Sequence, residues 1–229
     1  RDLHSFPTRR SSDLKKLLDT HIQASEVIQL NEPVNIFDEN TFNQVKEAHG
    51  IYQAQTSTAS RADTIAYATK KIVTERMEGD PAFYEKFSKL IQRVIEGFKS
   101  KRLSDLDYLN KVIDIRNKVV GKVHDGIPEK LSDNEAAMAY FGVVKPFLKS
   151  TEEIEEITAD TAIAIHAILE KYNKVHFWDD EDAQKQAINE IDDYLYDELK
   201  TAKDVELSLN QMDEIIKKVL QVAKFRSYR

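Results

Sequence analysis

The run from Ala62 to Ser88, ADTIAYATKKIVTERMEGDPAFYEKFS, most constrains the fold, because it contains parts of two helices and the junction between them. Gly79 is typical of a helix end, and Asp80-Pro81 places a capping carboxylate directly before a proline at the first helical position. Beyond the junction, apolar side chains recur at the spacing of one helix face. They are Phe83, Phe87, Leu90, Ile91, Val94 and Phe98, of which we expect Phe83, Phe87 and Ile91 to lie in the largest core.

Similar apolar stripes continue to the C-terminus, and most follow a residue suited to cap a helix. The chain has only 6 glycines and 5 prolines in 229 residues, which favours helices over strands and turns. We therefore predict an all-α fold, a bundle-like array of helices that is almost wholly helical after about Asp38. The expected caps are Ser60, Asp80, Ser104, Ser132, Ser150 and Ser208. Expected buried residues include Leu106, Leu109, Ile113 and Val120 after the third of these caps, and Met212, Ile215, Ile216, Val219 and Val222 in the last helix.

Two N-terminal segments depart from this pattern. Glu26–Asp38 alternates weakly and contains Pro33, which predicts a short extended linker or an edge strand. His4–Leu14, HSFPTRRSSDL, is the in-frame translation of a common sequencing-library adapter. We therefore expect residues 1–14 to be an artefact, the alternative being a true polar arm, and the natural chain to continue upstream of Lys15.

The remaining chain suits one medium domain or two small ones. Gly121 and Gly126 are the best candidates for an internal boundary, since glycines interrupt the helical pattern there. This predicts a first helical subdomain at 39–125 and a second at 126–229.

Charge is distributed unevenly along the chain. Residues 15–149 contain 20 basic and 19 acidic side chains, residues 150–214 contain 5 and 19, and residues 215–229 contain 5 and none. Binding along a phosphate backbone depends on neutralising phosphates, so the acidic middle segment is not expected to lie on DNA. It is suited to a basic protein surface or to solvent.

The sequence shows no self-contained active site. There is no cysteine, which excludes disulfides and thiolate zinc sites, and there is no GxxxxGK[ST] phosphate loop or HExxH motif. Asp179–Asp182 lacks the glycine of a calcium loop and is better explained as a helix cap in a solvated turn. Glu198-Leu-Lys200 imitates part of a nuclease motif but falls in a helical pattern, and His166 is a lone histidine on a helix. No apolar run approaches the roughly 20 residues of a membrane span and no signal peptide is visible, so we expect a soluble cytoplasmic protein.

Basic side chains are the remaining candidates for binding phosphates or acidic protein. Each of them is also compatible with an ordinary solvated helix surface. They are Lys70, Lys71, Arg93, Lys99, Lys101 and Arg102, and in the tail Lys217, Lys218, Lys224, Arg226 and Arg229.

Several stretches resemble the C-terminal helical region of R subunits, the motor and endonuclease subunits of type I restriction enzymes. The likeness extends over essentially all of the chain after Lys15 and is strongest at residues 62–88. Tyr67 departs from the family pattern, in which histidine is common, and this argues against catalysis at that position. The similar stretches include Pro33-Val-Asn-Ile-Phe-Asp38, Thr69-Lys-Lys71, Glu75-Arg-Met77, Asp80-Pro-Ala-Phe-Tyr84, Lys101-Arg-Leu-Ser104, Tyr140-Phe-Gly142 and the helix Met212–Lys224.

The resemblance implies that the parent subunit is an ATP-dependent, Mg²⁺-dependent endonuclease with a nuclease domain, two RecA-like motor domains and C-terminal helices. Those helices are implied to hold the motor on the core formed by the methyltransferase and specificity subunits. Residues 15–38 would be the linker from the missing motor region, and the chain by itself would be non-catalytic, without a cofactor, and would meet DNA through the parent complex. Two alternatives remain open: a helical accessory segment that contacts DNA for the motor, and an unrelated helical protein or an enzyme without a recognised motif.

Overall fold

The computed structural model describes residues 34–48, 57–124, 126–148, 151–174 and 176–228. Every regular element in these ranges is helical, which confirms the all-α prediction. The expected linker at residues 15–33 and the adapter-like residues 1–14 lie outside the described part. Residues 34–229 form one compact unit, within which the proposed division at 39–125 and 126–229 stays a prediction.

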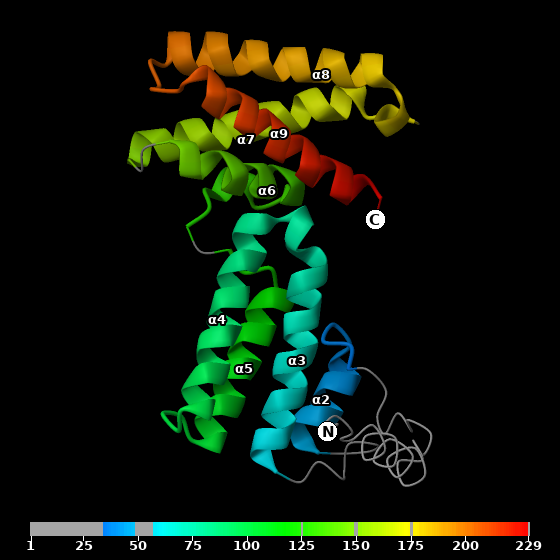
Figure 1. Ribbon diagram of the computed structural model, residues 1–229, viewed down its shortest axis with the longest axis vertical. Helices are drawn as coiled ribbons and strands as arrows, with labels where there is room; N and C mark the ends of the chain where they lie inside the picture. Colours follow the sequence, from blue (N-terminus) through cyan, green and yellow to red (C-terminus); the bar gives the residue numbers. More distant parts are fainter. Residues whose placement is uncertain (1–33, 49–56, 125, 149–150, 175, 229) are drawn as a thin grey trace, which may run out of the picture. The chain divides into compact units, whose positions relative to one another are not determined.

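The first helices pack side by side. Helices α3 (Thr58–Arg76), α4 (Pro81–Lys99) and α5 (Asp105–Val120) each contact the other two, and α2 (Glu39–Glu47) lies against α3 (Figure 1). A single 3₁₀ turn, η2 (Met77–Gly79), joins α3 to α4. The connection between α3 and α4 is therefore short, as predicted from Gly79 as a helix end and Asp80-Pro81 as a helix start.

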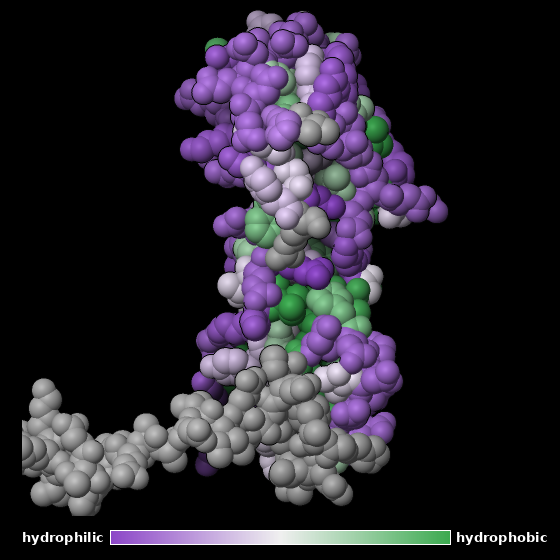
Figure 2. All heavy atoms as spheres, turned by 90° about the vertical axis from the view of Figure 1, so that its right-hand side faces the viewer, coloured by the Kyte–Doolittle hydropathy of each residue, from purple (hydrophilic) through white to green (hydrophobic). Residues whose placement is uncertain are grey.

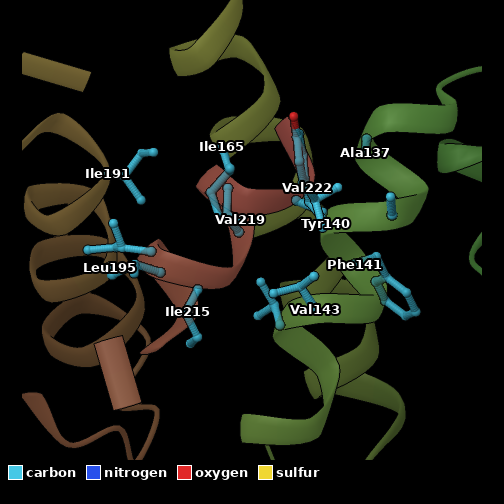
Figure 3. Packing of buried hydrophobic residues seen from close by; sticks show 14 of the residues in the cluster. Ala137, Tyr140, Phe141, Val143, Ile165, Ile191, Leu195, Ile215, Val219 and Val222 are labelled. Carbon is cyan, nitrogen blue, oxygen red and sulfur yellow. The ribbon is translucent and has the colours of Figure 1, made fainter. Parts of the chain in front are cut away.

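The later helices surround the largest hydrophobic cluster. They are α6 (Glu135–Val144), α7 (Glu152–Tyr172), α8 (Glu181–Tyr194) and α9 (Leu209–Ser227), with α8 continuing into a π-helix, η6 (Leu195–Ala202). Figure 3 shows how side chains from all of them converge, among them Phe141, Ile165, Leu195 and Val219. The 3₁₀ turn η3 (Glu129–Leu131) precedes α6, η4 (Lys145–Phe147) lies between α6 and α7, and η5 (Phe177–Asp179) lies between α7 and α8.

Three of the expected caps are confirmed. The Asp80 carboxylate accepts the Phe83 N–H at 3.1 Å, and the Ser104 hydroxyl accepts the Asp107 N–H at 3.1 Å. Ser208 and Gln211 form a reciprocal capping box at the start of α9. Each of these caps bonds to a backbone N–H three residues ahead, so both partners lie within one short stretch of sequence.

Three other helix starts differ from prediction by one to three residues. Ser57, not Ser60, caps α3, and its hydroxyl accepts the Ser60 N–H at 3.0 Å. Asn134, not Ser132, caps α6: its side-chain oxygen accepts the Ala137 N–H at 2.9 Å, whereas Ser132 ends the turn η3 with a helical backbone conformation that a cap residue does not adopt. Thr151 caps α7, and the expected Ser150 lies outside the described residues.

Three residues of the stripe on α4 are buried, but not in the largest cluster. Phe83, Phe87 and Ile91 pack with residues of α3 and α5, whereas the largest cluster belongs to α6–α9. The prediction of the largest core was therefore wrong. The reason is that α6 is covered on several sides, by α4, α7 and α9, and so buries more apolar residues than a helix with one covered face.

The buried face of α5 also differs from prediction. Leu106 was expected to be buried and is 62% exposed, whereas Leu109 is buried and Ile113 and Val120 are partly buried. The centre of the face is occupied by Tyr108, Val112, Ile115 and Val119. Tyr108 decides this rotation, because its ring stacks on Phe98 with centroids 4.3 Å apart and its hydroxyl donates to Asp63 at 2.8 Å. The last helix buries all five residues expected, Met212, Ile215, Ile216, Val219 and Val222.

Candidate functional site

Helices from distant parts of the chain meet at the α3–α4 turn. A Cβ placed on Gly142 of α6 would lie 2.6 Å from the Ala82 Cβ, and one on Gly79 would lie 2.9 Å from the Phe225 ring. Such distances are shorter than side chains tolerate, so the missing Cβ at each glycine leaves room for the neighbouring side chain. The junction is therefore closely packed, with α6 against the start of α4 and α9 against the turn η2.

Asp80 lies at the centre of this junction and is buried. Burial raises its pKa from 3.8 to about 6, while the bond from the Phe83 N–H and the charges of Arg226 and Lys122 act in the opposite direction. The Arg226 guanidinium lies 3.6 Å from Glu135 and donates to the Gly79 carbonyl at 3.4 Å. Lys122 also pairs with Glu135, and the two cations hold the pKa of that carboxyl below its usual value.

An apolar groove of about 770 Å³ adjoins the junction. Its walls come from the start of α4 with η2, from the end of α6 with η4, and from α9. Acidic side chains stand on the α4 side and lysines on the α9 side. The lining residues are Met77, Glu78, Pro81, Ala82, Glu85, Gly142, Val143, Pro146, Phe147, Lys218, Gln221, Val222, Lys224, Phe225 and Tyr228.

A second, more polar groove lies between α3 and α4, and it brings three of the predicted basic residues together. Lys70, Lys71 and Lys99 line this space of about 510 Å³ with Tyr67, whose side chain is 78% exposed. The Lys70 ammonium is 3.4 Å from the Gln92 side-chain oxygen, and Lys71 forms an exposed pair with Glu75 at 3.8 Å. The sequence placed Lys70 and Lys71 on one predicted helix and Lys99 on the next, without showing that the two helices bring these side chains together.

The other predicted basic residues of the first half are exposed but do not line this groove. Arg93 is on α4, and Lys101 and Arg102 follow its C-terminus. Lys101 adopts a left-handed backbone conformation with φ 58°, and the Arg102 side chain donates to the Ser100 hydroxyl at 2.8 Å. These contacts end the helix and are compatible with a purely structural role.

The predicted basic residues of α9 divide between two places. Lys218 and Lys224 line the apolar groove, where the Lys218 ammonium lies 4.8 Å from the Phe147 ring centroid. Arg226 belongs to the junction, through Glu135 and Gly79. Lys217 is exposed, and Arg229 lies outside the described residues. The tail therefore does not form a single basic patch with the lysines between α3 and α4.

The acidic segment is partly neutralised by lysines outside it. Lys130 bonds Glu156 and Asp160, both at 2.7 Å, and Lys145 bonds Glu155 at 2.6 Å. Many of its other carboxylates are exposed on α8 and η6, including Asp192, Asp193 and Asp197. The α6–α9 part of the face seen in Figure 2 is largely hydrophilic.

Arg116 and Arg76 were missed by the sequence reasoning. Arg116 is only 2% exposed, donates to the Ile36 carbonyl and pairs with Glu39 at 2.8 Å. Its guanidinium carbon lies 3.8 Å from the Phe42 ring centroid, and that of Arg76 lies 4.3 Å from the Phe37 ring centroid. The two arginines hold the Ile36-Phe37 turn against α5 and α3. The available signal for Arg116 was its position between Val112, Ile115 and Val119 on the buried face of α5.

The motifs considered for catalysis lie in a helix cap, in the π-helix and on a half-buried helix face. Asp180 caps α8 by accepting the Asp182 and Ala183 N–H groups, both at 3.0 Å, as expected for a cap in the acidic turn. Glu198 and Lys200 lie within the π-helix, and His166 is half-buried near Tyr140. In the described ranges, no three His, Asp or Glu side chains are grouped so as to hold a metal ion. No helix there combines the length and apolar character needed to cross a bilayer.

The chain matches no family model, no curated protein and no solved structure.

Proposed function

We propose that the chain is a helical docking module of a type I restriction R subunit, which attaches the motor to the methyltransferase core. In this role the chain itself is non-catalytic and needs no cofactor of its own. Its partners are the methyltransferase and specificity subunits of the same system, and it meets DNA through the assembled complex.

The observation that carries this proposal is the convergence of three stretches that resemble the family. Asp80–Tyr84 begins α4, Tyr140–Gly142 lies in α6, and Met212–Lys224 lies in α9. Although far apart in the sequence, the first two touch at Ala82 and Gly142, and α9 packs on both α6 and the turn η2. A resemblance carried by residues that pack together supports a shared architecture more strongly than the same residues scattered over a surface would.

The chemical roles of these residues favour a scaffold over an enzyme. Phe83, Tyr84 and Phe87 are buried, and Asp80 caps a helix. Their contribution is to position helices, which is what a docking module requires of them. The exposed carboxylates of α8 and η6 suit a basic protein surface better than a phosphate backbone.

The proposal is tested with the purified chain and the methyltransferase core of its own system. We expect the two to associate in a pull-down, and we expect neither ATPase nor nuclease activity from the chain. Tight DNA binding that persists at high salt, together with no association with the methyltransferase, would contradict the docking role.

A second candidate function is DNA contact on behalf of the motor, favoured by the groove between α3 and α4. Lys70, Lys71 and Lys99 provide three cations around one space, and the exposed Tyr67 ring offers a surface on which a base can stack. A DNA mobility-shift assay at two salt concentrations distinguishes this role. If it holds, Lys70→Glu with Lys71→Glu weakens binding and lowers its salt dependence, whereas reversal of Lys217, which lies elsewhere, leaves both nearly unchanged.

A further inference from the structure

The apolar groove beside the junction has the dimensions of a helix-binding site. Along α9, groove-lining residues run from Lys218 through Phe225 to Tyr228, a span of about 15 Å at the rise of an α-helix. This face of α9 differs from the one that packs into the main cluster, since only Val222 belongs to both. Three turns of α9 therefore present a second face to the groove.

The apolar surface of the groove is open to solvent, and two of its lining residues, Ala82 and Gly142, are in close contact. Tyr228 is 69% exposed, and Ala82 and Pro146 are also exposed. Ala82 and Gly142 approach too closely for a side chain at the glycine, so α4 and α6 are in direct contact beside the groove. A preformed apolar groove reduces the cost of ordering on binding, which favours a rigid amphipathic partner.

The two walls carry opposite charges. Glu78 and Glu85 stand on the α4 side, and Lys218 and Lys224 on the α9 side. Glu85 and Lys218 have partners one turn away in their own helices, Lys89 at 2.6 Å and Glu214 at 3.7 Å. These pairs are exposed, so they are weak and leave both charges available to another partner.

We infer that this groove binds an amphipathic helix of a partner protein, with basic side chains along the edge that faces α4 and acidic ones along the edge that faces α9. The walls are helices whose backbone groups bond internally, so strand addition is not the mode of binding. The inference deepens the proposed docking role and rests on it, because a docking module must present a surface that another protein covers.

The test uses the full chain and three crosslinked helical peptides of about four turns with the same apolar face. One peptide has a basic and an acidic edge, one has two basic edges, and one has two acidic edges. We expect fluorescence anisotropy to show that the wild-type chain binds the mixed-edge peptide about tenfold more tightly than either other peptide.

Charge reversal on the α9 wall provides the matched variant. Lys218→Glu with Lys224→Glu makes both walls acidic, so its preference is expected to change to the peptide with two basic edges. The control variant Lys111→Glu with Lys174→Glu changes the net charge of the chain by the same amount, at exposed sites on α5 and after α7. It is expected to keep the peptide preference of the wild type. Circular dichroism of both variants confirms that the helices are retained.

Equal binding of the three peptides, no binding, or an unchanged preference after reversal of the α9 lysines would overturn the inference. Self-association that the same reversal abolishes would also overturn it, by identifying a second copy as the occupant. If the chain binds the mixed-edge peptide but not the methyltransferase core, the groove inference holds and the proposed docking role fails. Failure of the inference can therefore be distinguished from failure of the proposed function.

Discussion

Asp80 shows at the scale of one residue how a helix cap and burial oppose each other. Its carboxylate stabilises the start of α4 through the Phe83 N–H, yet its burial disfavours the charged form and raises its pKa to about 6. The folded state therefore holds this proton more tightly than the unfolded state does. The contribution of the protonated Asp80 carboxyl to the free energy of unfolding is fully present below about pH 4 and is lost as pH rises through about 6.

Asp80→Asn is expected to keep an acceptor at the cap and to remove this pH dependence. The variant should match the wild type in free energy of unfolding near pH 4 and exceed it by up to about 3 kcal/mol near pH 8. Asp80→Ala should be about 1 kcal/mol less stable than Asp80→Asn, because the cap is lost. Urea denaturation across this pH range measures the free energy of unfolding. If this free energy changed with pH in the same way in the wild type and in Asp80→Asn, the Asp80 carboxyl would be excluded as the source of the pH dependence.

Arg116 is the second residue with a large expected effect. Arg116→Met retains much of the side chain over Phe42 but removes the bonds to the Ile36 carbonyl, and should cost about 2–3 kcal/mol of stability. Glu39→Gln should cost less than about 1 kcal/mol, because the Glu39 side chain is 63% exposed. Chemical denaturation of the two variants checks this order, and equal losses would mean that the Glu39 ion pair matters more than the carbonyl contact.

At the scale of elements, apolar spacing identifies a helix more reliably than it identifies the buried face. In α4 the stripe and the buried face coincide at Phe83, Phe87 and Ile91. In α5 they do not, because the aromatic contact between Tyr108 and Phe98 rotates the helix and leaves Leu106 in solvent. Two apolar side chains with similar sequence surroundings therefore contribute very differently to stability.

Phe87→Ala is expected to cost about 3–5 kcal/mol, since the side chain is buried between α3, α4 and α5. Leu106→Ala should change stability by no more than about 0.5 kcal/mol, because Leu106 is exposed. Thermal or chemical unfolding of the pair tests the assignment. A large loss for Leu106→Ala would contradict the exposed position of its side chain.

At the scale of the whole molecule, the contact between Ala82 and Gly142 connects the clusters of α3–α5 to that of α6–α9. Gly142→Ala would ordinarily stabilise a helix, but here its Cβ would lie 2.6 Å from that of Ala82. We expect the variant to lose about 1–3 kcal/mol through forced separation of α4 and α6. The double variant with Ala82→Gly should recover much of this loss, and a double-mutant cycle that shows no coupling would contradict the close contact.

The sequence by itself determined the local features of this protein. Helix formation and the caps at Asp80, Ser104 and Ser208 follow from interactions within about four residues along the chain. The buried face of α9 was also predictable, because its apolar residues form a single stripe at helical spacing. The same local chemistry explains the acidic turn before α8, where Asp180 is the cap. The sequence also identified Lys70, Lys71 and Lys99 as candidates for binding, but only as separate side chains.

Only the tertiary structure decided which surfaces face each other. It placed the three lysines around one groove, assigned Phe87 to a smaller cluster, buried Arg116 and formed the apolar groove from α4, α6 and α9. Each of these features depends on contacts between residues tens of positions apart, such as Arg116 with Ile36 and Ala82 with Gly142. Periodicity within one helix carries no information about such contacts, because many rotations of neighbouring helices bury a similar number of apolar residues.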